Sequence, residues 1–211
     1  MFVFQPQVAI ASINISIFKR FFFRVTCIVL LYLESFHTYI LGIVETCFQR
    51  GDIFLSLIDV GGQRSERKKW LHCFESVNTI LFIVSMSEYD QTLEEDGQVN
   101  RMKESLRLFT SVCNVKWFSK ASMILFLNKK DVFDEKIVYS PITTCFETYY
   151  GPQQKEEASA YISQQFLSQN HSKREVYRHF TCAKNSENIS VVFDSVADVI
   201  SQNLLLDIGL I

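Results

Sequence analysis

Two short polar motifs, each at the end of an apolar run, hold the residue types best suited to chemistry. The first is DVGGQ at 59–63, where the Asp59 carboxylate suits a Mg²⁺ ion held through water molecules. Gly61 and Gly62 carry no Cβ, so their backbone N–H groups can approach a terminal phosphate closely. Gln63 then stands where a side-chain amide could orient an attacking water. A plain strand and turn with a glycine pair is the alternative interpretation of this motif taken alone.

The second motif is NKKD at 128–131, directly after the apolar run 123–127. This pattern suits guanine, because the Asp131 carboxylate can accept hydrogen bonds from both the ring N1–H and the exocyclic amine, which adenine cannot offer. Asn128 would support the loop and the base edge, and a lysine stem would pack over the ring. A site with such fixed partners rejects other bases strongly. Both motifs in one chain, each at a strand end, are more specific than either alone.

Apolar runs and helical periodicity indicate the elements that must position these motifs. Runs of strand length occupy 53–59, 79–84 and 123–127, and 176–182 is a further candidate strand. Continuous apolar runs of this length are typical of central parallel strands. Helical spacing appears in two sets of residues: Met102, Leu106, Phe109 and Val112, and then Ile189, Val192, Phe193, Val196, Val199 and Ile200. This alternation predicts an α/β fold with a largely parallel sheet, helices on both faces, and ligands at the carboxyl ends of the strands.

Composition excludes several other classes of protein. The chain has 211 residues, 48% hydrophobic and 21% charged, which excludes a disordered chain and suits one domain with a sizeable core. The formal net charge of −2 gives no electrostatic case for binding nucleic acid. The six cysteines include no CxxC pair, and the four histidines do not interleave with them as metal ligands would. We therefore expect no nucleic-acid partner and no cysteine-based metal site.

The first 41 residues differ in character from the rest and form an atypical hydrophobic segment. Its apolar run at 25–33 is shorter than the roughly 20 residues that a membrane-spanning helix needs. The run has the length and the basic flank of a signal or anchor segment, but no small-residue cleavage site follows it. A foreign or mis-joined segment, and a buried strand or helix, are the other interpretations. We therefore treat 1–41 and 42–211 as separate units.

From about Gly42 the motifs follow one another in an order that a known family shares. Residues 59–70 (DVGGQRSERKKW) are followed by NRMKESLRLF, WFSKASMILFLNKKD, YISQQF, VYRHFTCA and the ending NLLLDIGLI. On these motifs the chain resembles the alpha subunit of heterotrimeric G proteins over 42–211, about four-fifths of its length. The resemblance implies the C-terminal part of a Ras-like GTPase domain, with a sheet of the P-loop NTPase type. The ending looks more like the inhibitory class than the others.

The resemblance implies roles for individual nucleotide-site residues. Asp59 would support Mg²⁺ indirectly through water, the Gly62 amide would meet the γ-phosphate, and Gln63 would be the catalytic residue that positions the hydrolytic water. The nucleotide-binding residues that the family implies are Asp59, Val60, Gly61, Gly62, Gln63, Asn128, Lys129, Lys130, Asp131 and Ala183. The implied cofactors are GTP or GDP and Mg²⁺, and the implied activity is GTP hydrolysis.

The resemblance also implies a switch and a set of partners. A switch helix that rearranges with the γ-phosphate would hold Arg64, Arg67 and Trp70, with Glu104 as its latch partner. The receptor-reading tail would be Leu204, Leu205, Leu206, Asp207, Ile208, Gly209, Leu210 and Ile211. The implied partners are a G-protein-coupled receptor, the beta-gamma dimer and an effector enzyme that the sequence does not identify. The implied location is the cytoplasmic face of the plasma membrane. Met1-Phe2 is not an N-myristoylation site, so a cytosolic location is the alternative.

The chain departs from the family pattern around the phosphates. The P-loop GxxxxGK[ST] does not occur, because there is no Gly-Lys dipeptide, and the inserted helical domain has no counterpart. The position of the catalytic arginine falls on His37, that of the Mg²⁺-binding threonine on Ile40, and Lys184 stands beside the base pocket. A largely neutral imidazole and an aliphatic side chain do not replace those groups. We therefore expect GTP binding and hydrolysis to be weakened or lost.

The missing P-loop strand also affects the expected fold, since in the family this strand lies in the centre of the sheet. We expect a sheet that lacks it, and hypothesise that part of 2–33 fills the gap. Two further interpretations of the chain stay open. It is either a non-catalytic interaction module that competes for the receptor or the beta-gamma dimer, or a fragment produced by a gene-model error.

Overall fold

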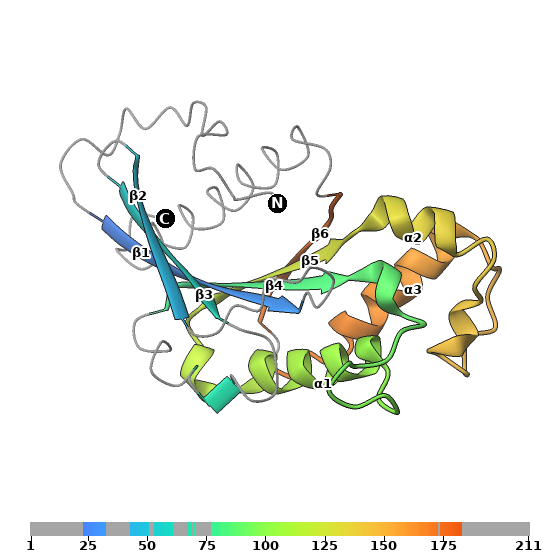
Figure 1. Ribbon diagram of the computed structural model, residues 1–211. Coiled ribbons are helices and arrows are strands. Elements are labelled where there is room, and N and C mark those ends of the chain that lie inside the picture. Colours follow the sequence, from blue (N-terminus) through green and yellow to red (C-terminus); the bar gives the residue numbers. More distant parts are fainter. Residues whose placement is uncertain are drawn as a thin grey trace.

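The computed structural model describes residues 23–32, 43–50, 53–60, 67–68, 70, 77–172 and 174–182. Within these ranges the chain forms one six-stranded sheet and three α-helices (Figure 1). The strands are β1 (Phe23–Tyr32), β2 (Ile43–Arg50), β3 (Ile53–Val60), β4 (Thr79–Ser85), β5 (Ser122–Asn128) and β6 (Val176–Phe180). The helices are α1 (Arg101–Asn114), α2 (Lys130–Lys136) and α3 (Lys155–Leu167), with 3₁₀ turns at Met86–Glu88, Lys116–Phe118 and Ile142–Thr144.

β1 occupies the centre of the sheet, in the strand order β2-β3-β1-β4-β5-β6. It runs parallel to both neighbours, and Val29 is level with Asp59 on one side and Leu81 on the other. This placement corrects the expectation of a sheet that lacks its central strand. It confirms the hypothesis that part of the N-terminal hydrophobic segment fills the gap. The physical reason is composition, because a nearly continuous apolar run rich in Val, Ile and Leu suits a strand with neighbours on both sides.

The sheet is parallel except at one edge. β1, β3, β4, β5 and β6 pair in parallel, whereas β2 pairs antiparallel with β3. The predicted largely parallel α/β sheet is therefore confirmed. Leu30 of β1, Val60 of β3 and Ile43 of β2 are level with one another. The connection from β1 to β2 consequently starts and ends at the edge where the parallel strands have their carboxyl ends.

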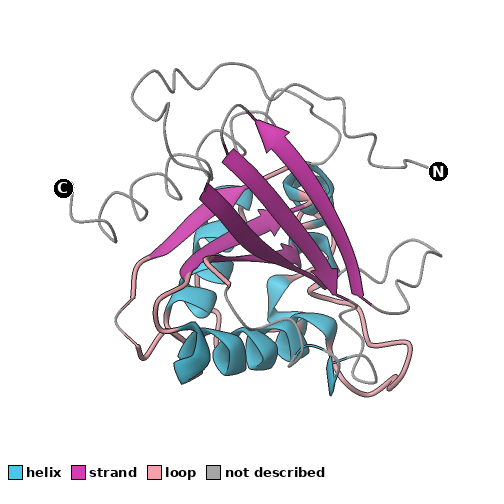
Figure 2. Cartoon of the chain, turned by 90° about the vertical axis from the view of Figure 1, so that its left-hand side faces the viewer, coloured by secondary structure: helices cyan, strands magenta, loops and turns pink. Residues whose placement is uncertain are grey.

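One hydrophobic core lies between the sheet and the helices α1 and α3. Phe82 of β4, Phe109 of α1 and Phe166 of α3 are fully buried in it. The Phe82 and Phe109 rings meet edge to face with centroids 5.1 Å apart, and Phe109 and Phe166 do so at 5.5 Å. Met102 and Val112 belong to the same core, as the helical spacing predicted. Figure 2 shows the helices gathered against this face of the sheet.

The opposite face of β4 and β5 is buried as well. Leu81, Ile124 and Phe126 are at most 6% exposed, although they alternate along their strands with residues of the core. Burial on both faces is expected of central parallel strands. The closing helix predicted at 189–200 lies outside the described residues, so helices on both faces stay a prediction. None of the helices in the described ranges has the length and apolar character needed to span a membrane.

Candidate functional site

The described residues of both polar motifs lie at the carboxyl edge of the sheet. Asp59 is next to last in β3, Asn128 is the last residue of β5, and Thr181 follows β6 directly. Ser85, at the end of β4, is level with Asn128. β3 and β5 are three strand spacings apart, roughly 14 Å. The fold therefore places the two motifs on one edge with a gap between them, which is where ligands bind in open α/β sheets.

Hydrogen bonds join the NKKD loop to the loop that follows β6. The hydroxyl of Thr181 donates to Asn128 Oδ1 at 3.1 Å. The backbone N–H of Thr181 donates to the Leu127 carbonyl at 2.9 Å, and the N–H of Lys130 donates to the Thr181 carbonyl at 3.1 Å. The side-chain oxygen of Asn128 therefore holds the NKKD loop to the loop that follows β6. Any base bound here would meet both loops as one unit.

The NKKD loop turns sharply into α2. Lys129 has a φ of 58°, the only positive φ of a non-glycine residue among the residues that the structure describes. This left-handed conformation lets the chain leave β5 and begin α2 at Lys130 within one residue. Lys130 forms an ion pair with Asp134 one turn further along α2. Asp131 is half-buried in the first turn of α2, at the carboxyl edge where the base is expected.

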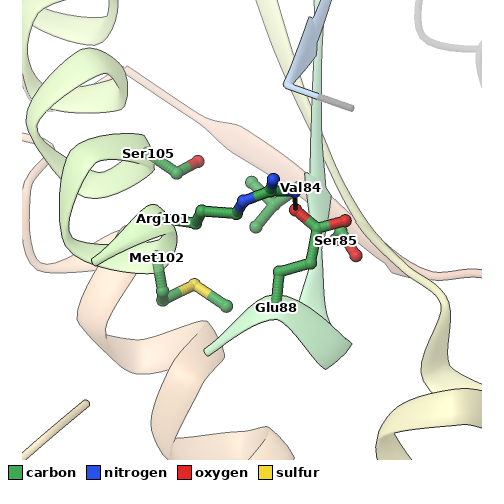
Figure 3. A pocket seen from close by; sticks show the side chains of 6 residues that line it. All are labelled: Val84, Ser85, Glu88, Arg101, Met102 and Ser105. Atoms are coloured by element: carbon green, nitrogen blue, oxygen red, sulfur yellow. Dashed lines mark hydrogen bonds and ion pairs between the residues drawn. The ribbon is translucent and has the colours of Figure 1, made fainter. Parts of the chain in front are cut away.

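The Lys129 ammonium pairs with a buried carboxylate that the sequence did not single out. Glu88 lies in the 3₁₀ turn after β4 and is 3% exposed. Its Oε1 accepts from Lys129 Nζ at 2.9 Å. Its Oε2 accepts from Arg101 at 3.3 Å, and Figure 3 shows this second contact. Sequence reasoning missed Glu88 and Arg101. The available signal was position, because Glu88 lies just beyond the carboxyl end of a buried strand, as the Asp59 and Asn128 motifs do.

The start of α1 is fixed next to this ion pair. Asn100 caps the helix, because its Oδ1 accepts from the backbone N–H of Lys103 at 3.0 Å. The amide of Asn100 also donates to the Tyr89 carbonyl at 2.6 Å. The cap therefore ties α1 to the turn after β4 and sets the direction of its first side chains. Arg101 Nε donates in addition to the Thr92 carbonyl at 2.8 Å, which holds its guanidinium against Glu88.

Asp59 has the features of a cation-supporting carboxylate. Its Oδ1 is buried and has no hydrogen-bond partner. Burial raises the pKa of the Asp59 carboxyl to about 6, while a backbone hydrogen bond at Val60 lowers it. A buried oxygen without a donor fits a hard cation or its water shell. The described residues hold no cluster of three or more His, Cys, Asp or Glu side chains, and the support of Mg²⁺ by Asp59 through water stays a prediction.

Part of the predicted switch is packed onto α1. Arg67 donates to Glu104 Oε1 at 2.8 Å, and the Glu104 side chain is only 7% exposed. Trp70 is 5% exposed and belongs to the hydrophobic core, whereas Lys68 is exposed. The predicted partners Arg67 and Glu104 therefore meet in the structure. Their role as a latch stays a prediction.

Several predicted site residues lie outside the described residues, and their roles stay predictions. Val60 is described and is 1% exposed in the core. The predicted residues that are not described are Gly61, Gly62, Gln63, Arg64, His37, Ile40, Ala183, Lys184 and the tail Leu204–Ile211. Of the predicted nucleotide-binding residues, the structure therefore describes the NKKD loop, Asp59 and Val60.

Comparison with known proteins bears directly on this arrangement. A family model described as G-protein alpha subunit matches residues 31–200. The chain belongs to the G-protein alpha subunit family. Two relatives are "Guanine nucleotide-binding protein G(o) subunit alpha" from Lymnaea stagnalis and from Planorbella trivolvis. Each is 58% identical over 170 residues, which cover 80% of this chain and 48% of the relative. These matches place the chain in an inhibitory-like class of G-protein alpha subunit.

The match covers most of this chain but only part of each relative. The chain spans about half the length of the curated relatives that it matches. The matched range of the G-protein alpha subunit model begins at residue 31, within β1, and ends at residue 200. The match therefore includes the NKKD loop, Glu88 and the Arg67–Glu104 pair. It does not extend over the predicted receptor-reading tail at 204–211.

Proposed function

We propose that this chain binds guanine nucleotides as a G-protein alpha subunit in receptor-coupled signalling, and that it binds the base better than the phosphates. The hydrogen bonds between the two loops support this proposal. The Thr181 hydroxyl donates to Asn128 Oδ1 at 3.1 Å, and the Lys130 N–H donates to the Thr181 carbonyl at 3.1 Å. Both bonds are formed by protein groups alone. The base-recognising half of the site is therefore prepared before any ligand binds, which lowers the entropic cost of binding.

Each residue of the NKKD loop has a distinct part in base recognition. Asp131 accepts from the N1–H and the amine of guanine, and Asn128 holds the loop in place. The Lys129 stem covers the face of the base. The backbone N–H of Ala183, in the loop that begins with Thr181, donates to the base carbonyl. Adenine presents an unprotonated N1 and leaves the Asp131 carboxylate unpaired, which disfavours it strongly.

Phosphate handling is the weaker half of the proposed function. Asp59 would hold Mg²⁺ through water, and that ion when bound neutralises phosphate charge. Gly61 and Gly62 would offer N–H groups to the γ-phosphate, and Gln63 would orient the hydrolytic water. In members of this family an arginine at the position of His37 contributes about 10³ to 10⁵ in rate. We therefore propose slow GTP hydrolysis and weak Mg²⁺-dependent affinity.

The direct test is titration of the purified chain with a fluorescent GTP analogue, with and without Mg²⁺. We expect saturable binding that GDP displaces and ATP does not, with only a small gain from Mg²⁺. Phosphate release should fall far below that of intact relatives measured in parallel. Displacement by ATP as effective as by GDP, or turnover equal to that of intact relatives, would contradict the proposal.

A matched pair of variants separates base recognition from general damage. Asp131→Asn removes the acceptor for guanine and should weaken the analogue at least about tenfold, because a hydrogen-bonding site discriminates strongly. Glu135→Gln changes a nearby exposed carboxylate of α2 and should leave affinity unchanged. Equal losses in the two variants would show that the measured binding is not base recognition.

The alternative function, a non-catalytic interaction module, is favoured by a different observation. Arg67 is held by Glu104 at 2.8 Å and Trp70 is buried, so part of the switch region is docked onto α1. Such a surface could engage the beta-gamma dimer, and the tail at 204–211 could engage a receptor. By family resemblance this would take place at the cytoplasmic face of the plasma membrane. A folded chain that binds no guanine nucleotide in the titration would support this alternative.

A further inference from the structure

A buried ion pair connects the base-recognising loop to the neighbouring strand end and helix. Glu88, in the turn after β4, accepts from Lys129 at 2.9 Å and from Arg101 at 3.3 Å. The side chains of Glu88 and Arg101 are 4% and 8% exposed, and that of Lys129 is 21% exposed. One carboxylate therefore joins the end of β4, the start of α1 and the NKKD loop. Sequence reasoning assigned no functional role to Glu88 or Arg101.

We propose that Glu88 is a positioning residue for guanine recognition, acting by fixing the Lys129 side chain and the turn that carries it. The proposal rests on the proposed function, because it concerns the same base site. With its ammonium held by Glu88, Lys129 offers its apolar stem, and not its charge, to the base. Asp131 comes directly after two fixed residues. The side chain of Lys129 is held by Glu88, and the backbone N–H of Lys130 is held by the Thr181 carbonyl.

Backbone conformation explains why this loop needs an anchor. Lys129 is held at a φ of 58°. The left-handed region is unfavourable for a residue with a Cβ, so the surroundings must hold it there. The Lys130 N–H bond to the Thr181 carbonyl holds the loop from one side. The Glu88 carboxylate holds it from the other, through the Lys129 ammonium.

Burial explains why Glu88 can hold Lys129 firmly. A surface pair between long side chains contributes little, because water and salt screen it. Glu88 is 3% exposed, and a carboxylate out of water needs close positive partners. Arg101 is itself fixed, since its Nε donates to the Thr92 carbonyl at 2.8 Å. Glu88 is therefore a preoriented acceptor for Lys129.

The test combines hydrogen exchange on the nucleotide-free chain with nucleotide titration. Glu88→Gln keeps the shape and removes the charge. We expect faster exchange of the backbone amides at 129–131 and an affinity for GDP weakened on the order of tenfold. Glu147→Gln is the matched control, because Glu147 pairs with Lys103 at 3.6 Å in a largely exposed pair. It should change neither measurement.

A second variant separates positioning from general stability. Lys129→Met keeps an apolar stem, removes the ammonium, and leaves Glu88 paired with Arg101. If Glu88 acts through Lys129, the double variant Glu88→Gln/Lys129→Met binds GDP no more weakly than Lys129→Met alone. Additive losses would overturn the proposal. If Glu88→Gln does not fold, faster exchange at 129–131 in Lys129→Met supports the proposal and unchanged exchange overturns it.

Failure of the proposed function is distinguishable from failure of this inference. A wild-type chain that binds no guanine nucleotide contradicts the proposed function, while exchange at 129–131 still reports on Glu88. Unchanged exchange at 129–131 in Glu88→Gln overturns the inference, whether or not nucleotide binds. Faster exchange confined to those residues, with the amides of β5 unchanged, supports it.

Discussion

Asp59 shows how a single residue can be unfavourable for folding and useful for binding. Its Oδ1 is buried without a hydrogen-bond partner, and burial raises the pKa of its carboxyl to about 6. The charged form is therefore less stable in the folded chain than in water. A cation at the carboxyl edge would remove this disadvantage, since it favours the ionised carboxylate. Such strained polar groups are common at functional sites.

This electrostatic cost predicts a pH dependence of stability. Between the unfolded pKa near 4 and the folded pKa of about 6, the folded chain binds more protons at Asp59 than the unfolded chain does. The free energy of unfolding therefore falls as pH rises through this window, by about 1–2 kcal/mol, because solvent screens part of the effect at this partly exposed carboxyl. Asp59→Asn should lose this component. The measurement is urea unfolding of both proteins from pH 4 to 7 without nucleotide.

The comparison is made on the difference between the two proteins, because other carboxylates titrate in the same window. Asp134→Asn is a suitable control, since Asp134 lies in a partly exposed pair on α2. Parallel stability profiles for wild type and Asp59→Asn would show that the Asp59 carboxyl is not perturbed by burial.

At the scale of elements, the placement of β1 decides whether the rest of the sheet can form. β1 separates β3 from β4, so without it the β2–β3 hairpin would have no partner in the sheet. Isolated two-stranded hairpins are marginally stable in water. The central strand also brings Asp59 and the NKKD loop to one edge, because its register with β3 and β4 sets their relative height.

A proline in β1 should therefore be severely destabilising. Ile28 is level with Ile58 on β3 and Ile80 on β4, and a proline there loses its N–H and clashes in the centre of the ladder. We expect Ile28→Pro to lower the free energy of unfolding by about 3 kcal/mol or more. Ile28→Val, a conservative control, keeps the backbone N–H and should lower the free energy of unfolding far less. Chemical unfolding followed by circular dichroism measures both.

If β1 were not part of the folded sheet, the two Ile28 variants would unfold at the same denaturant concentration as the wild type. That outcome would remove the structural basis for a complete sheet in this chain. It would also favour the interpretation of the segment 1–41 as a foreign or mis-joined extension.

At the scale of the whole molecule, the described residues combine a six-stranded sheet with part of the predicted nucleotide site. The base loops and the Arg67–Glu104 pair are formed, while the sequence contains no P-loop motif. In the two proposed functions, partner binding and nucleotide hydrolysis would depend on different parts of the molecule. We therefore expect them to be separable in this chain, which distinguishes the proposed nucleotide-binding function from the interaction module.

Partner capture tests this separation. We expect the full chain to be retained by immobilised beta-gamma dimer and by an activated receptor, in each case without hydrolysable nucleotide. Deleting 204–211 should abolish capture by the receptor and leave capture by beta-gamma dimer unchanged, because the tail is expected to contact only the receptor. Arg67→Ala should reduce capture by beta-gamma dimer. Equal receptor capture with and without the tail would contradict this interpretation.

Local features of the sequence were sufficient to predict much of the fold. The apolar runs ending at Asp59 and Asn128 predicted β3 and β5, and the helical spacing of Met102, Phe109 and Val112 predicted α1 and its buried face. These predictions succeed because strand and helix periodicity are local properties of the chain. The motifs at the strand ends also predicted that Asp59 and Asn128 lie at one edge of the sheet, as they do.

Tertiary structure alone decided three further points. The run at 25–33 is compatible with a strand, a helix or a signal segment, and only pairing with β3 and β4 made it the central strand. The Thr181–Asn128 bond and the Glu88–Lys129 pair join residues that are far apart in the sequence. Such contacts have no local periodicity, because they arise only when the strand ends come together at one edge. The sequence by itself therefore determined the family and the motifs, and the fold determined which side chains hold them in place.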